Sequence, residues 1–240
     1  MFRYIYIVLL SMGISLFGTM VGASIGVIIK KPSKSILSYI MGLAGGLMLA
    51  VVVFELIPEA VDKINIPRTI AFYSLGIAII MLIEFIFSKK QGEKSYKQIA
   101  FITALGLMLH NLPEGIIMGF GFLVEESLGI EMSIIIAIHD IPEGIAVTAP
   151  LMASKVKPSK IMLYAFLTAL PTALGAAIGI SLGGVSESTL GAYLALASGI
   201  MMYVIFGELI PESNKLSSGI MTTLSVITGL TLGYIMLNLI

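Results

Sequence analysis

The chain has 240 residues, of which 58% are hydrophobic and 12% are charged, and its formal net charge at pH 7 is zero. A soluble domain of this length carries about 25% charged residues, so a mean hydropathy of +1.04 excludes that class. The sequence has no cysteine, which excludes a disulfide framework and a thiolate metal site. The zero net charge gives no reason to expect a nucleic-acid partner.

Apolar runs of about 20 residues, the length that crosses a bilayer as a helix, recur along the whole sequence. They predict an all-α polytopic membrane protein with one transmembrane domain over residues 1–240. We interpret the first run as a retained helix, because it continues without a clear cleavage site for a signal peptide. The eight predicted spans are 4–29, 36–57, 69–87, 99–122, 132–153, 161–182, 189–210 and 220–239.

The charged residues between the spans predict the orientation. Loops after the even-numbered spans hold only Lys63 and Arg68, and the loop at 123–131 is acidic. Because lysine and arginine gather on the cytoplasmic side, we expect a cell-membrane protein with both termini outside. The lysines after the odd-numbered spans are Lys30, Lys31, Lys34, Lys89, Lys90, Lys94, Lys97, Lys155, Lys157, Lys160 and Lys215.

Span 2 ends on a pair of acidic residues that a proline separates. Glu55 falls inside the span, where it is a candidate to line a pathway, and Pro58 and Glu59 follow. Glu59 is predicted at the membrane interface, where a solvated acid costs little. For Glu59 a plain helix end remains an alternative to a functional role.

Spans 4 and 5 each contain one copy of a six-residue motif, and the two copies hold the only histidines of the chain. In a helix the first, second and fifth residues of each copy share one face. Imidazole nitrogens and carboxylate oxygens that converge on one point are ligands of divalent transition metals. The candidate ligands are His110, Asn111 and Glu114 in span 4 and His139, Asp140 and Glu143 in span 5.

Both motifs are predicted to lie near the middle of the membrane, on antiparallel neighbouring helices. An isolated charge at that depth costs roughly 2.5–3.5 kcal/mol or more. The carboxylates of Glu114, Asp140 and Glu143 therefore need a cation or protons to neutralise them. The alternative is that the His–Glu pairs satisfy each other and only join two helices. The duplication argues against this alternative, because one polar pair would suffice for that purpose.

The chain repeats itself with a shift of 153 residues, which carries Gly46–Glu59 onto Gly199–Glu212. Glu208 and Glu212 are thereby the counterparts of the span 2 acids. Spans 1–3 therefore repeat as spans 6–8, and the lysine pattern makes the repeat inverted. Inverted repeats with a site between them are typical of alternating-access transporters.

The two motifs, the Glu-Leu-Ile-Pro-Glu segments and the eight spans together resemble the ZIP (Zrt-/Irt-like protein) family of divalent metal transporters, above all its bacterial zinc-uptake members. The resemblance implies a 3+2+3 arrangement of the spans at 4–87, 99–153 and 161–239. It also implies zinc import toward the cytoplasm, a homodimer and no resident cofactor.

The resemblance further implies two metal positions. One metal would take His110, Glu114, His139 and Glu143, and a second would take Asn111, Asp140 and the two bridging glutamates. Some members add a span 6 glutamate, and Thr172 stands at its place here. The chain is therefore expected to bind the second metal weakly.

Other functions remain open at this point. An intramembrane metalloprotease would need His-Glu-x-x-His on one helix, which neither motif has. A gated cation or proton channel would show similar ionisable residues at mid-membrane, although the repeat favours a carrier. Nitrogen and oxygen ligands alone do not distinguish zinc from iron, manganese, cobalt, nickel or cadmium.

Overall fold

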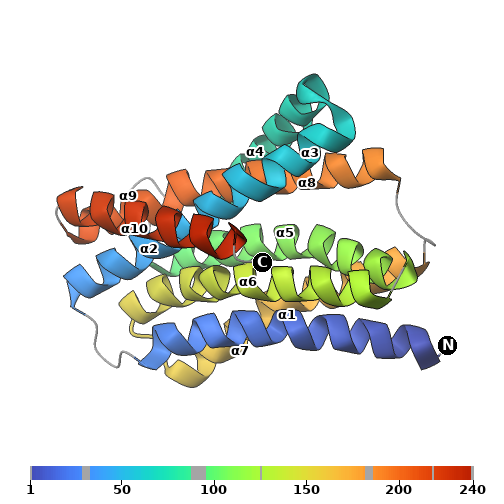
Figure 1. Ribbon diagram of the computed structural model, residues 1–240. Helices are drawn as coiled ribbons and strands as arrows, with labels where there is room; N and C mark the ends of the chain where they lie inside the picture. Colours follow the sequence, from blue (N-terminus) through green and yellow to red (C-terminus); the bar gives the residue numbers. More distant parts are fainter. Residues whose placement is uncertain are drawn as a thin grey trace.

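The computed structural model describes residues 2–28, 33–87, 96–124, 126–181, 186–217 and 219–238, but not the side chains of a few helical residues, Pro113 and His139 among them. The described part is helical apart from short turns and contains no strand (Figure 1). Its elements are α1 (Phe2–Ile28), α2 (Lys34–Val51), η1 (Val52–Leu56), α3 (Ile57–Ile64), α4 (Ile66–Phe87), α5 (Tyr96–Val124), α6 (Glu126–Ala153), α7 (Pro158–Ser181), α8 (Glu187–Val204), η2 (Ile205–Leu209), α9 (Ile210–Leu216) and α10 (Gly219–Asn238).

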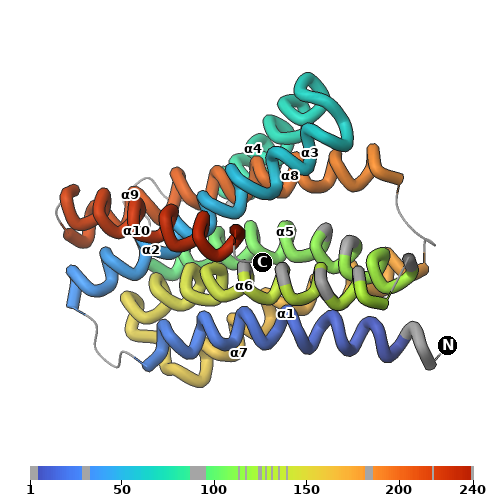
Figure 2. The backbone as a smooth tube through the Cα atoms, in the orientation of Figure 1, coloured from blue at the N-terminus to red at the C-terminus, as the bar shows by residue number. Residues whose placement is uncertain are grey.

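Eight helices of the described chain are long and apolar enough to cross a membrane, which confirms the predicted number. The chain is a multi-pass membrane protein of the all-α class. The backbone trace in Figure 2 shows the chain passing back and forth, with most long helices roughly parallel and α3 and α4 inclined to them. Five of the loop lysines that predicted the orientation lie outside the described residues: Lys30, Lys31, Lys89, Lys90 and Lys94.

Spans 2 and 7 are longer than the sequence predicted, and each contains a five-residue π-helical turn. The predicted ends at 57 and 210 are too early, because the helical path continues to Ile64 and Leu216. Proline lacks an N–H and its ring clashes with the carbonyl one turn earlier. The wider turns η1 and η2 just before Pro58 and Pro211 absorb this clash, so the helix continues instead of ending.

Helix α1 crosses α6 at a point where glycines bring the two backbones together. A Cβ added at Gly22 would overlap the carbonyl oxygen of Ile141, and one added at Gly144 would overlap that of Thr19. Such close approach through small residues is how helices pack in lipid, where no hydrophobic effect drives them together. The second central helix is therefore held tightly against the first helix of the chain.

Helix α7 crosses α5 in the same manner. A Cβ at Gly115 would overlap the carbonyl oxygen of Thr172, and one at Gly175 would overlap that of Leu112. Figure 1 shows α1 and α7 running in opposite directions beside the central pair α5 and α6. Both motif-bearing helices are thus fixed by a neighbour whose backbone touches the glycine that ends the motif.

These two crossings are related by the sequence repeat. The shift of 153 residues carries Thr19 to Thr172, and the spacing of the two motifs carries Gly115 to Gly144. The contact between Thr19 and Gly144 therefore has its counterpart in the contact between Thr172 and Gly115. The sequence repeat is accompanied by a repeat of helix contacts.

The outer helices repeat their contacts as well. Helix α2 packs against α10, and α8 packs against α4. Gly46 and Gly229 meet at the first crossing, while Gly199 and Gly76 each face a backbone carbonyl at the second. The same shift of 153 residues carries Gly46 to Gly199 and Gly76 to Gly229, so the two outer pairs are equivalent.

Candidate metal centre

The first motif lies at the midpoint of α5. That helix has 29 residues from Tyr96 to Val124, so 14 residues precede His110 and 14 follow it. Helix α5 stays continuous through the motif. His110 and Glu114 are therefore one turn apart on a single face, as the spacing predicted. The two residues are 1% and 2% exposed, respectively.

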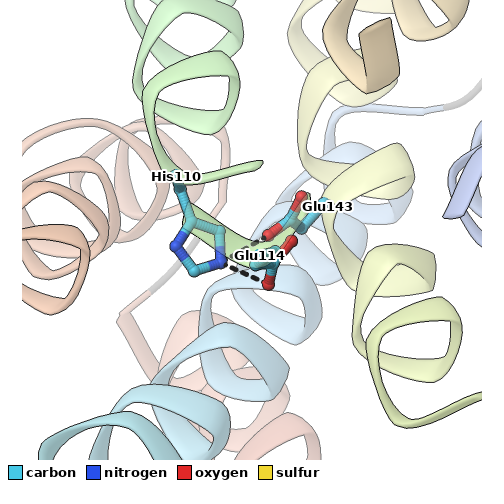
Figure 3. Close-up of side chains that lie close together, drawn as sticks. All are labelled: His110, Glu114 and Glu143. Atoms are coloured by element: carbon cyan, nitrogen blue, oxygen red, sulfur yellow. Dashed lines mark ion pairs between the residues drawn. The ribbon is translucent and has the colours of Figure 1, made fainter. Parts of the chain in front are cut away.

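Three potential ligands from the two central helices meet at this point (Figure 3). The Nε2 atom of His110 lies 2.9 Å from Oε1 of Glu114 and 3.3 Å from Oε1 of Glu143. Glu143 comes from α6 and is only 2% exposed. One ligand atom from each of the three residues lies within 4.8 Å of the other two. The cluster joins α5 to α6 in the interior of the helix bundle.

The spacing of these atoms suits a small divalent cation. Two ligand atoms at the usual 2.0–2.1 Å from a tetrahedral zinc stand about 3.3 Å apart. The distance from His110 to Glu143 has this value, and the distance to Glu114 is 0.4 Å shorter. Because both carboxylates are buried, a cation between them would relieve their repulsion and their lost solvation. Both distances from the imidazole are therefore close to the spacing of two ligands on one zinc ion.

Asn111 is the next potential ligand on α5. Its Nδ2 atom donates a hydrogen bond to the backbone carbonyl of Thr168 on α7 at 2.9 Å. Its Oδ1 atom is buried and has no hydrogen-bond partner among the described residues. A buried polar atom without a partner is costly, so this amide oxygen is suited to accept a cation. The side chain is thus fixed by its nitrogen, which leaves its oxygen for a ligand.

The second motif is described only in part. Asp140 is fully buried on α6, and its Cβ is among the nearest atoms to Gly18 of α1. Among the described residues, Asp140 is not in the group of ligand atoms within 4.8 Å of each other. The side chain of His139 lies outside the described part of the structure, so its role stays a prediction.

Thr172, the span 6 position that the sequence singled out, is fully buried beside the first motif. Its backbone carbonyl faces Gly115, and its hydroxyl accepts a hydrogen bond from Ser15 of α1 at 3.3 Å. Thr168, one turn earlier, supports Asn111 through its carbonyl. The face of α7 that carries both threonines therefore lies against the motif of α5.

The four proline-associated glutamates differ more than their sequence symmetry predicted. Glu208 is 2% exposed and Glu212 is 6% exposed, whereas Glu55 is half-buried and Glu59 is exposed. Glu59 pairs with Lys63 at 2.8 Å, so for this residue a solvated helix end is an adequate account. Its counterpart Glu212 is buried instead, although it also pairs with a lysine at 3.2 Å. Glu55 and Glu208 both lie within the π-helical turns.

Sequence reasoning missed Ser15 and Thr168 as neighbours of the motif. Three buried hydroxyl residues, Ser11, Ser15 and Thr19, follow each other at four-residue intervals on the otherwise apolar α1. That spacing places them on one face, and it was the signal available in the sequence. A further contact that the sequence did not indicate involves Glu84 of α4. Its carboxylate accepts a hydrogen bond from the hydroxyl of Tyr203 at 2.5 Å.

Comparison with known proteins identifies the family of this chain. The model of a family described as ZIP Zinc transporter matches residues 88–240, which include both motifs. The proteins named zinc transporter ZupT from Clostridium perfringens and Salmonella heidelberg are each 28% identical to this chain; the first alignment covers 88% of each chain and the second 89%. That of Stenotrophomonas maltophilia is 26% identical, over 88% of this chain and 87% of its own length. Because the family model matches well over half of its length, the chain belongs to the ZIP family of zinc transporters.

Proposed function

We propose that this protein carries zinc across the cell membrane toward the cytoplasm, with the metal held between α5 and α6 during transfer. The observation that carries the proposal is the buried cluster of His110, Glu114 and Glu143 at the midpoint of a membrane-spanning helix. Ionisable side chains inside a membrane are functional by default, because their insertion is costly. Zinc is here the transported substrate and not a resident cofactor, as membership of this transporter family implies.

The complete ligand set that we propose for the first metal adds His139 to the three clustered residues. Two imidazoles and two carboxylates then form a tetrahedral shell without any thiolate. A second, weaker position would use Asn111 and Asp140 with the shared glutamates. The amide oxygen of Asn111, which has no hydrogen-bond partner among the described residues, supports this position. Thr172 in place of a glutamate argues for low occupancy.

For the mechanism, we propose a carrier built from inverted repeats in a 3+2+3 order. The matched crossings of α1 with α6 and of α7 with α5 support this arrangement, since symmetric contacts allow two related conformations. Glu55 and Glu208 are candidates for the pathway, because the π-helical turns that hold them are frequent at functional sites. Glu212 is a further candidate, and a homodimer is the proposed assembly.

Zinc flux into proteoliposomes tests this proposal. Purified protein is reconstituted around a zinc-sensitive dye, and the initial rate is followed as external zinc rises. We expect a rate that saturates and that falls to the protein-free level in His110→Ala. Flux that rises without limit and is abolished by the same change would identify a channel. No flux above protein-free vesicles would overturn transport itself.

Competition in the same vesicles defines the range of metals. Nitrogen and oxygen ligands accept several first-row cations, and affinity generally increases from manganese through cobalt to nickel. We expect cobalt, nickel and cadmium to inhibit zinc flux more strongly than manganese at equal concentration. Calcium and magnesium should inhibit least, because they prefer sites made of oxygen alone.

A further inference from the structure

A cavity of about 680 Å³ opens beside the proposed transport site, at the end of the bundle where α5 and α7 begin and α6 ends. Its volume is within the range of about 300–1,000 Å³ that is usual for pockets that bind small molecules. Met108 and Thr168 line it farthest along α5 and α7, and we call this part the floor; the end at the loop between α6 and α7 we call the mouth. The proposed metal ligands are not among the residues that line it.

Four lysines stand at the mouth of this cavity. Lys97 comes from the first turn of α5, Lys160 from the first turn of α7, and Lys155 and Lys157 from the loop between α6 and α7. All four are exposed, and none of the cavity-lining residues is acidic. A mouth with four positive charges repels a divalent cation, so the cavity is poorly suited as a route for zinc and well suited to an anion.

The walls of the cavity are largely apolar, and some of the residues that form them are also exposed on the outer surface of the bundle. Phe101, Tyr164 and Leu167 line it, and these residues are 46%, 43% and 39% exposed. A free inorganic anion would leave these walls without a partner. An amphiphile with an anionic head and an acyl chain matches both the mouth and the walls.

The depth of the cavity also matches one leaflet. Met108 lies eleven residues beyond Lys97 on α5 and Thr168 eight residues beyond Lys160 on α7. At 1.5 Å per residue the floor lies about 12–17 Å below the lysines, which is roughly half of the 30 Å hydrocarbon core. A phospholipid whose phosphate contacts the lysines would therefore place its chain along the full cavity.

We propose that this cavity binds an anionic phospholipid from the leaflet that contacts the lysine-bearing end of the protein. Basic pockets between membrane helices are a recognised way to hold such headgroups. The acyl chain gains little by leaving one apolar environment for another, so selectivity comes from the lysines. Thr168 links the cavity floor to Asn111, which places the lipid next to the proposed metal site without making it a ligand.

Native mass spectrometry of the purified protein with added phosphatidylglycerol or phosphatidylcholine tests the proposal. We expect phosphatidylglycerol adducts to survive at collision energies that remove phosphatidylcholine. In Lys157→Gln/Lys160→Gln the apparent affinity for phosphatidylglycerol should fall about 25-fold, since each lysine near an anionic surface contributes about fivefold. The matched control is Lys34→Gln/Lys215→Gln, which removes two lysines that do not line the cavity and should retain the adducts.

Two further arms separate the lipid from other occupants. Inorganic phosphate in excess should not displace phosphatidylglycerol, and displacement would assign the cavity to a soluble anion instead. Ala104→Trp fills the apolar wall and should reduce phosphatidylglycerol binding while zinc binding and monodispersity stay unchanged. Equal retention of both lipids, or equal loss in the lysine variant and its control, would overturn the proposal.

Discussion

At the scale of single residues, one nitrogen of the His110 imidazole faces two carboxylates that come from different helices. We predict that Glu143→Gln lowers zinc affinity at least tenfold, because the amide keeps the shape of the side chain but loses its charge. Changes even to groups behind a metal ligand typically cost 10–100-fold in affinity. Equilibrium zinc binding to the purified variant measures the effect.

Glu59→Gln is the matched control, since this residue also lies in a Pro-Glu pair but is exposed and bound to Lys63. The control should bind zinc as the unmodified protein does. If Glu143→Gln kept its affinity, the buried cluster would be structural and the ligands would have to be sought elsewhere.

Thr172 supports a second residue-scale prediction, which concerns stoichiometry. Its side chain is fully buried and its carbonyl faces Gly115 at the end of the first motif. We predict that Thr172→Glu raises occupancy of the second metal position, because a carboxylate offsets the repulsion between two nearby divalent ions. Zinc equivalents per chain, counted by equilibrium dialysis, should rise from about one toward two.

Thr172→Gln controls for the size of the new side chain, because it is nearly isosteric with glutamate but carries no charge. It should leave the count near one. Two tight equivalents in the unmodified protein, or equal counts in both variants, would show that the stoichiometry or the span 6 position is wrong.

Much of the candidate site could be predicted from the sequence, because its candidate ligands lie in short motifs whose helical spacing places them on one face. His110, Glu114 and Glu143 do meet in the structure. Ser15 and Thr168 could not be assigned in this way, since their contacts with Thr172 and Asn111 depend on how α1 and α7 cross the central helices. The unequal burial of Glu59 and Glu212 likewise comes from packing that the sequence repeat does not specify.

At the scale of helices, the backbones meet at glycines, and this predicts where substitutions are tolerated. A Cβ at Gly22 would overlap the carbonyl oxygen of Ile141, which belongs to the backbone and cannot move aside alone. We predict that Gly22→Ala destabilises the protein by about 1–3 kcal/mol through overpacking. The thermal unfolding temperature in detergent should fall.

Gly13→Ala, on the same helix, is the control for this substitution. A Cβ at Gly13 meets nothing within 4 Å, so only helix propensity changes, and alanine gains up to about 1 kcal/mol there. The unfolding temperature should stay constant or rise. An equal fall in both variants would attribute the effect to the helix itself and not to the crossing.

The number of spans was predictable because membrane thickness fixes the length of an apolar helix. The π-helical turns were not, because a proline in a span predicts a disturbance without saying whether the helix ends or widens. In η1 and η2 it widens, and the helical path goes on to Ile64 and Leu216. These turns occupy equivalent positions in the repeat, so both halves accommodate the proline by the same widening of the helix.

At the scale of the whole molecule, the contacts divide the long helices into groups. Helices α1, α5, α6 and α7 pack against one another, while α2 pairs mainly with α10 and α4 with α8; contacts of α2 with α6 and of α8 with α5 join these groups. The repeat in the sequence predicted which helices correspond to each other. It did not predict which helices contact each other, because the same sequence repeat is compatible with several arrangements of the helices in the membrane.

The orientation of the molecule in the membrane remains a prediction and can be tested directly because the chain has no cysteine. Lys157 lies in the loop between α6 and α7, and Glu126 begins α6 at the opposite end; both are exposed. Since lysine-bearing loops stay in the cytoplasm, we predict that Glu126→Cys reacts with an impermeant maleimide in intact cells, whereas Lys157→Cys reacts only after permeabilisation. Labelling of Lys157→Cys in intact cells would reverse the topology, and would then place the lipid cavity in the outer leaflet.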